Sequence, residues 1–193
     1  EILDKAWQVG IPHVTFTGGE ATLREDLVEL IRHAEGLGQV CGLLTNGLRL
    51  SEMPYLDELL QSGLDHILFV LEPSQPESWT ALQTILPQDV FVTVHMTVTN
   101  ENAGDALAFL ERLASIGCKS LSLSFADPSI PATILANAAA SLGLSLKFDL
   151  PVPYSADNPV AREIAQDTAA DGAGTAWLYV EPDGDVLPAQ GMS

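Results

Sequence analysis

The sequence predicts an α/β protein in which parallel strands and covering helices form a partial (β/α) barrel, followed by a small β-hairpin. Two observations indicate this fold. Short apolar runs alternate with amphipathic helical segments along residues 1–150, as they do when crossover helices join parallel strands. After Leu150 the alternation stops, so we expect residues 1–150 to form the core domain and residues 151–193 a linker and the start of a C-terminal extension.

Six segments have the length and the apolar, β-branched composition of strands: residues 13–17, 40–45, 66–72, 90–99, 120–126 and 144–150. An antiparallel sheet with one wet face is the alternative, and the helical segments between the strands disfavour it. A barrel-like sheet carries its ligands at the carboxyl ends of the strands. Residues at these ends are therefore the first candidates for function.

The helices are predicted from apolar spacing and from residues that begin or end a helix. The chain starts in a helical segment, EILDKAW. In the next helix Thr22 and Glu25 form a capping-box pattern, and Gly36 is expected to close its end. Ser51 is expected to cap the following helix, which Gly63 ends. From there on, helices are expected at residues 52–63, 76–86, 101–117 and 131–143.

The C-terminal extension is predicted to have three parts. A Pro-rich connector covers residues 151–159, and a short polar helix with a loop covers residues 160–174. Residues 176–189 are predicted to form a hairpin that turns at residues 182–185, Pro-Asp-Gly-Asp.

Alternation along the strands predicts one apolar and one polar face of the sheet. The apolar face is expected to pack against the helix residues Leu27, Leu30, Ile31, Leu107 and Leu110. The polar face is expected to line a concave interior with Thr15, Thr17, Thr93, His95, Thr97, Ser122 and Ser124. His95 is then either a hydrogen-bonded interior histidine or a residue that reaches a substrate. The other histidines show no metal-ligand spacing.

Composition narrows the classes of function. The 26 Asp and Glu against 8 Lys and Arg give a formal net charge of −18. This charge repels phosphate backbones and anionic lipids, so neither a nucleic acid nor a membrane is expected as a partner. Cys41 and Cys118 indicate neither a disulfide scaffold nor a thiolate metal site, and they fit a reducing cytoplasm.

Two polar turns that contain glycine follow neighbouring predicted strands. The first is Thr17-Gly18-Gly19-Glu20, and the second is Thr45-Asn46-Gly47. The glycines leave no side chain between the backbone and whatever lies above the strand end, and Glu20 adds a charge there. A plain strand-to-helix turn is the alternative for the first motif.

These motifs resemble the radical S-adenosylmethionine (radical SAM) superfamily, and within it the cofactor-maturation and peptide-modifying branch, whose SPASM or twitch-like C-terminal extension often holds auxiliary iron–sulfur clusters. The resemblance covers nearly the whole chain, and its best parts are VTFTGGEATLREDLVELI, GLLTNGLRL, SGLDHILFVLE, VTVTNENAGDALAFLERLASIG and YVEPDGDVLPAQG. It implies that Gly18, Gly19 and Glu20 hold the amino group of SAM. It also implies that Thr45 and Asn46 lie near the cofactor or the substrate.

The chain departs from the family pattern at several points. Ala21 stands where the family usually has Pro, and Val70 stands where relatives often have a serine that contacts the cofactor, with Glu72 as a loose substitute. Ala189 replaces a cysteine that ligates an auxiliary cluster in many relatives. The family's three-cysteine loop, which binds a [4Fe–4S] cluster, would precede the first helix. We therefore expect an internal fragment that lacks this loop and the first barrel strand.

The resemblance implies a parent enzyme that reductively cleaves SAM at a [4Fe–4S] cluster for radical modification of a small-molecule or peptide substrate, in metallocofactor or peptide maturation. The fragment alone is expected to bind no cluster and to be inactive. Its uncovered edge at residues 13–17 is expected to favour self-association.

Two rival functions are kept. A barrel lyase or aldolase would need Lys5, Lys119 or Lys147 as its catalytic lysine, and their predicted positions argue against that. A non-catalytic binding or scaffold module is the other rival, and Val70 and Ala189 support it because both lack an expected functional group.

Overall fold

The computed structural model describes residues 1–127, 129–147, 178–181 and 183–187. The strands are β1 (His13–Phe16), β2 (Val40–Thr45), β3 (Leu64–Leu71), β4 (Phe91–Val98), β5 (Ser120–Phe125), β6 (Ser145–Lys147), β7 (Tyr179–Val180) and β8 (Val186–Leu187). The α-helices are α1 (Ile2–Gln8), α2 (Leu27–Leu37), α3 (Met53–Gln61), α4 (Pro76–Ile85), α5 (Ala106–Ser115) and α6 (Ala132–Ser141). The 3-10 turns are η1 (Ala21–Leu23), η2 (Leu48–Ser51) and η3 (Ala103–Asp105).

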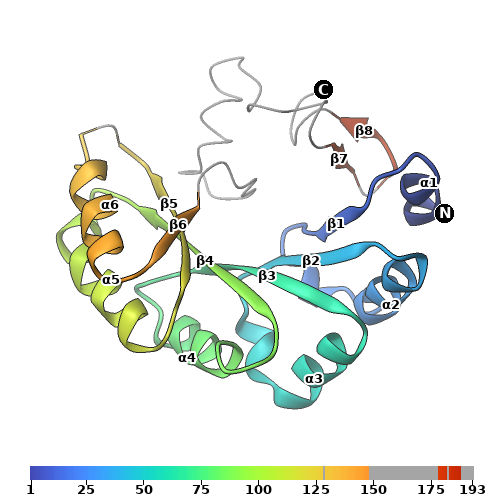
Figure 1. Cartoon of the computed structure of the whole chain (residues 1–193), viewed down its shortest axis with the longest axis horizontal. Coiled ribbons are helices and arrows are strands. Elements are labelled where there is room, and N and C mark those ends of the chain that lie inside the picture. Colours follow the sequence, from blue (N-terminus) through green and yellow to red (C-terminus); the bar gives the residue numbers. More distant parts are fainter. Residues whose placement is uncertain (128, 148–177, 182, 188–193) are drawn as a thin grey trace.

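The six strands β1–β6 form one sheet in the order β1-β2-β3-β4-β5-β6, and every neighbouring pair is parallel. The strand order does not reverse, as it does in doubly wound sheets, so each strand lies beside the next one in sequence. Figure 1 shows a curved sheet with α2–α6 along its outer side. The predicted α/β fold, a partial barrel of parallel strands, is confirmed.

The hydrophobic core lies between the sheet and these helices. Apolar residues of the strands and of the helices form one cluster, with fully buried members that include Leu43, Phe69, Val94, Leu121, Ile31, Leu59, Leu82 and Leu110. Burial of a side chain of this size stabilises the fold by about 1.5–3 kcal/mol. This packing holds the carboxyl ends of the strands in fixed positions relative to one another.

The predicted start of α2 is wrong. Thr22 lies in η1 instead of capping α2, because its backbone N–H bonds to the Glu20 carboxylate. The helix begins at Leu27 and runs past Gly36 to Leu37, where Gly38 ends it at φ 94°. Leu23 lies in η1 and is 73% exposed.

Two other local predictions are also wrong. Ser51 does not cap α3, because it belongs to η2 and its hydroxyl donates to the Leu48 carbonyl. Leu107 is 47% exposed and does not pack against the sheet, whereas Leu110 on the same helix is fully buried. The predicted end of α3 is confirmed, since Gly63 follows the helix at φ 100°.

The predicted C-terminal hairpin is confirmed in part. Strands β7 and β8 pair antiparallel, and the Gly184 N–H donates to the Glu181 carbonyl across the turn. The connector and the polar helix predicted at residues 151–174 lie outside the described residues, and so do the boundary at residue 150 and Ala189.

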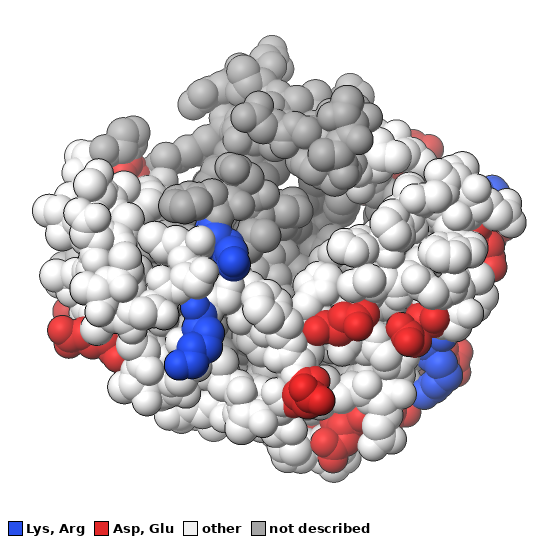
Figure 2. All heavy atoms as spheres, viewed as in Figure 1, with Lys and Arg blue, Asp and Glu red and all other residues white. Residues whose placement is uncertain are grey.

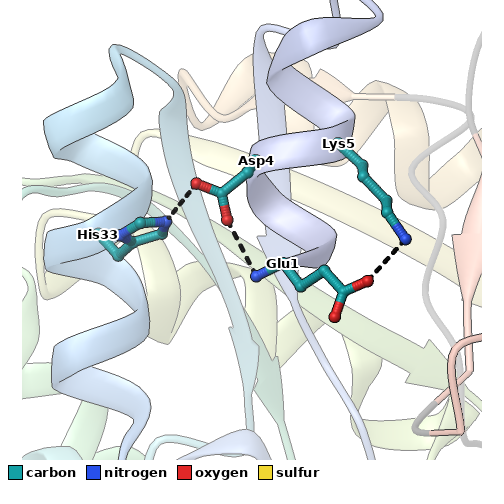
Figure 3. Close-up of polar contacts among 4 residues, drawn as sticks. All are labelled: Glu1, Asp4, Lys5 and His33. Carbon is teal, nitrogen blue, oxygen red and sulfur yellow. Dashed lines mark hydrogen bonds and ion pairs between the residues drawn. The ribbon is translucent and has the colours of Figure 1, made fainter.

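Helix α1 lies against α2 through few contacts. Figure 3 shows Asp4 of α1 and His33 of α2, whose Oδ1 and Nε2 atoms are 3.1 Å apart. Lys5 Nζ and Glu1 Oε1, at 2.8 Å, pair within the same helical segment. All of these side chains are exposed to water, so the ion pairs add little stability.

Acidic side chains dominate the charged surface. Figure 2 shows them gathered over the region of α3, where Glu52, Asp57 and Glu58 are exposed. Among the described helices, none combines the length and the apolar character that a membrane crossing requires.

Candidate ligand site at the ends of β1 and β2

Glu20 is the centre of a hydrogen-bonded junction between the ends of β1 and β2. Its Oε1 accepts from the Thr22 N–H at 3.0 Å, the Thr22 hydroxyl at 2.7 Å and the Thr45 hydroxyl at 2.6 Å. Its Oε2 accepts from the Asn46 N–H at 2.8 Å. A carboxylate oxygen has about two acceptor positions, so with the donors among the described residues Oε1 is fully used and Oε2 keeps one position open.

The second predicted turn, Thr45-Asn46-Gly47, is held in place by its own hydrogen bonds. The Thr45 hydroxyl accepts from the Gly47 N–H at 2.9 Å, and the Asn46 Oδ1 accepts from the Leu48 N–H at 3.0 Å. Gly47 is required here, because its φ is 71° and a Cβ atom would lie 2.0 Å from the Phe69 ring. The sequence motif therefore marks a backbone turn that packs tightly on β3.

The backbone of Gly18 and Gly19 is open on the side where a Cβ would project. Apart from the glycines and their chain neighbours, no atom of the described residues lies within 4 Å of a Cβ built on either glycine, and Gly18 has a φ of 144° that L side chains rarely adopt. Directly before them, the Thr17 Oγ1 is buried and has no hydrogen-bond partner within the described part of the chain. We call the group formed by Thr17, Gly18, Gly19 and Glu20 the strand-end cradle.

A second contact fastens η1 to the following turn and helix. The Thr22 carbonyl accepts hydrogen bonds from the Arg49 guanidinium and, at 3.4 Å, from the Tyr55 hydroxyl. The guanidinium carbon of Arg49 lies 4.0 Å from the centre of the Tyr55 ring, in a cation–π contact. No sequence pattern singles out Arg49 and Tyr55, because their partner lies 27 and 33 residues earlier in the chain.

The concave face of β4 and β5 carries a polar ladder. The Thr93 and Ser120 hydroxyls are 3.0 Å apart, and His95 Nδ1 lies 3.1 Å from the Ser122 hydroxyl. His95 is 1% exposed, and burial lowers its pKa to about 4, so the imidazole is neutral at pH 7. Of the two interpretations of His95, the structure agrees with an interior histidine that is hydrogen-bonded within the protein.

The concave face of β2 and β3 is apolar towards the carboxyl ends of the strands. Leu44, Leu68 and Val70 form a cluster of their own, separate from the main core. The prediction of a polar concave face is therefore correct for β4 and β5 but wrong for β2 and β3, whose sequences lack the hydroxyl alternation. Gly42 lies on this face too, and a Cβ there would be 2.2 Å from the His66 Nε2.

At the end of β3, the two residues that depart from the family pattern, Val70 and Glu72, provide no hydroxyl on the concave face. Val70 packs with Leu44 and Leu68. Glu72 is exposed, and its carboxylate accepts a hydrogen bond from the Ser74 hydroxyl at 3.0 Å.

Of the lysines considered for the lyase rival, Lys5 lies on α1 and Lys119 precedes β5, whereas Lys147 ends β6.

Three thiolates, the set that a [4Fe–4S] cluster with one open iron needs, are not available in this chain. The chain contains 2 cysteines, and burial raises the pKa of the Cys41 and Cys118 thiols to about 11. Within the described ranges no group of three or more His, Cys, Asp or Glu side chains is arranged to hold a metal ion. The residues present therefore do not fit a [4Fe–4S] cluster.

Comparison with known proteins gives the family of the chain. A PqqA peptide cyclase of Ruegeria pomeroyi is 28% identical over 218 aligned residues, which cover 96% of this chain and 56% of the relative. One of a Methylobacterium species is 26% identical and covers 97% of this chain and 56% of the relative. One of Xanthomonas campestris is 39% identical over 75 residues, 39% of this chain and 20% of the relative.

This chain thus spans about half the length of the first two curated relatives. The relatives agree with the predicted peptide-modifying branch. The model of the radical SAM superfamily matches residues 1–126, which include both glycine turns and the strands β1–β5. The chain belongs to the radical SAM superfamily.

Proposed function

We propose that the protein is a radical SAM enzyme that modifies a peptide, and that this chain contributes the surface that receives the amino acid end of SAM. The observation that carries the proposal is the strand-end cradle, where bare glycine backbone lies beside a carboxylate with one open acceptor position. The family match supports SAM as the cofactor, and the peptide cyclase relatives support a peptide as the substrate.

The chemistry of the cradle suits a primary ammonium group. Glu20 Oε2 can accept one further hydrogen bond, and a charged donor makes such a bond about twice as strong as a neutral one. Open space on the Cβ side of Gly18 and Gly19 leaves room for a ligand beside their backbone. We propose that Gly18, Gly19 and Glu20 bind and orient the amino group of SAM. Thr45 and Asn46 keep the Glu20 carboxylate in position through their hydrogen bonds to it.

The concave face would receive the rest of the ligands. The hydroxyls of β4 and β5, with the neutral His95 holding that of Ser122, make one part of this face polar without adding charge, and the apolar cluster on β2 and β3 excludes water. The reductive cleavage of SAM to a 5′-deoxyadenosyl radical belongs to the proposal for the whole protein. We propose that the thiolates for its [4Fe–4S] cluster lie outside these 193 residues, since this chain has only 2 cysteines. The proposal includes a reducing, cytoplasmic location.

The test compares two glycines in the full-length protein, reconstituted under anaerobic conditions. Gly19 and Gly36 both have ordinary φ values and open space around a built Cβ, but only Gly19 lies in the cradle. We expect Gly19→Ala to raise the Kd for SAM about tenfold, because the methyl group fills the ligand's place, with an unchanged melting temperature. Gly36→Ala should leave SAM binding and formation of 5′-deoxyadenosine as in the wild type.

Other outcomes would contradict the proposal. Equal SAM affinity of Gly19→Ala and the wild type would remove the cradle from the binding site. A full-length protein that takes up a [4Fe–4S] cluster but makes no 5′-deoxyadenosine with peptide candidates would favour the scaffold rival.

A further inference from the structure

Two threonines end neighbouring strands of the sheet, and their hydroxyls have opposite surroundings. Thr17 follows β1 and directly precedes Gly18, whereas Thr45 is the last residue of β2. In both motifs a threonine precedes a backbone segment that contains glycine, so the sequence alone does not distinguish the roles of the two threonines. The structure distinguishes them by the partners of their hydroxyl groups.

The Thr45 hydroxyl is fully engaged inside the protein. It donates to Glu20 Oε1 at 2.6 Å and accepts from the Gly47 N–H at 2.9 Å, and the residue is 1% exposed. A hydroxyl has one proton to donate, and here Glu20 takes it. Thr45 therefore has no donor left for a ligand.

The Thr17 hydroxyl is buried and unused. Within the described residues its Oγ1 has no hydrogen-bond partner, although almost no solvent reaches it. A buried polar atom without a partner destabilises the folded protein, and such atoms in native structures call for an explanation. A ligand that brings an acceptor oxygen into the cradle would satisfy this hydroxyl.

We propose that Thr17 is a binding residue of the strand-end cradle and that Thr45 is a positioning residue for the Glu20 carboxylate. This assignment rests on the proposed function and refines it. The ligand class is an α-amino acid group, as in SAM, whose ammonium suits Glu20 Oε2 and whose carboxylate suits the Thr17 hydroxyl. Thr45 contributes to binding only through the carboxylate that it holds.

The two roles predict different effects on the melting temperature when each hydroxyl is removed. Thr17→Val deletes an unpaired buried hydroxyl and keeps the side-chain shape, so the melting temperature should stay the same or rise. Thr45→Val leaves the Gly47 N–H without its partner and removes one of the three donors to Glu20 Oε1, so the melting temperature should fall by about 5 °C. Both valine variants should bind SAM about tenfold more weakly.

The experiment measures the full-length protein and four variants, Thr17→Val, Thr17→Ser, Thr45→Val and Thr45→Ser. Thermal unfolding gives the melting temperatures, and calorimetry with SAM gives the Kd. Amide hydrogen exchange of Asn46, whose N–H bonds to Glu20, reports on the position of the carboxylate. Exchange should be faster in Thr45→Val but not in Thr17→Val. Both serine variants keep the hydroxyl, so their Kd values should stay within about twofold of the wild type.

Each part of the proposal can be overturned separately. If the wild type binds SAM and Thr17→Val binds it equally well, the Thr17 assignment is wrong while the proposed function stands. If Thr45→Val keeps the melting temperature and the exchange rate of the wild type, Thr45 is not a positioning residue. If the wild type binds no SAM, the proposed function and the Thr17 assignment are both wrong, and the stability measurements alone decide the role of Thr45.

Discussion

The two halves of the concave face use the same strand geometry for different surfaces. On β2 and β3 the inward side chains include Leu44, Leu68 and Val70, which form an apolar cluster. On β4 and β5 they form the polar ladder, in which Thr93 pairs with Ser120 and His95 with Ser122. The halves meet where Val70 lies beside His95 in the register of β3 and β4.

The difference shows how a buried face can be polar without a large loss of stability. Two polar side chains on β4, Thr93 and His95, have their partners directly opposite on β5, because parallel register brings Thr93 to Ser120 and His95 to Ser122. The apolar half needs no such match. A substitution that alters polarity should therefore lower the free energy of unfolding in either half. In the apolar half it buries a polar group, and in the polar half it removes a hydrogen-bond partner.

The largest expected effect lies at the turn after β2, where Gly47 packs against Phe69 of the main core. Gly47→Ala should lower the free energy of unfolding by about 3 kcal/mol, because it adds a methyl group against the Phe69 ring at a φ of 71°. Gly104→Ala is the matched control, since a Cβ at Gly104 meets no atom of the described residues within 4 Å, its chain neighbours apart. Urea denaturation of both variants checks this. Equal stability would show that the turn can move away from β3.

A pH-dependent loss of stability should come from the polar half. Burial lowers the pKa of His95 from 6.5 to about 4, so below pH 6.5 the unfolded chain takes up a proton that the folded protein does not. This contribution is fully present above pH 6.5 and is lost progressively as the pH falls towards 4. Between pH 7 and pH 5 the free energy of unfolding should fall by about 2 kcal/mol through this group.

The control for this prediction is His95→Gln, which keeps a hydrogen-bonding side chain but does not titrate. Denaturation at pH 7 and pH 5 should show a smaller decrease for the variant than for the wild type. The same decrease in both proteins would assign the pH dependence to other groups.

A reciprocal exchange of polarity compares the halves directly. Val70→Thr places a hydroxyl in the apolar cluster, and Thr93→Val leaves the Ser120 hydroxyl without its partner. Each isosteric change should lower the free energy of unfolding by about 1 kcal/mol. Chemical denaturation measures both. A stabilising Thr93→Val would mean that the ladder does not depend on paired hydroxyls.

The smallest effect concerns the outer edge of the sheet. Among the described strands, β1 and β6 are the edges, and β6 ends at Lys147 whereas β1 has no lysine. We expect β1 to favour weak self-association at high concentration and Thr15→Lys to reduce it, because an edge lysine opposes strand pairing. Light scattering over a concentration series measures this. A wild type that stays monomeric throughout would contradict the prediction.

The positions of the elements could be predicted largely from local sequence. The predicted strand at residues 40–45 has the observed bounds of β2, and the other strands of the main sheet agree within a few residues where they are described. Apolar periodicity determines these elements because a strand or helix buries one face wherever it lies in the fold. The positions of Gly18, Gly19 and Glu20 at the end of β1 followed from the same reasoning.

The partners of the site residues could not be predicted in this way. Glu20 meets Thr45 and Asn46 from 25 and 26 residues away, and this contact also draws Thr22 away from α2. The sequence by itself determined the strands, the helices and the glycine turns, because these depend on neighbouring residues. The tertiary structure alone decided that the Thr45 hydroxyl is engaged and that the Thr17 hydroxyl has no partner among the described residues. Hydrogen bonds and packing between distant segments exist only once the sheet has brought the strand ends together.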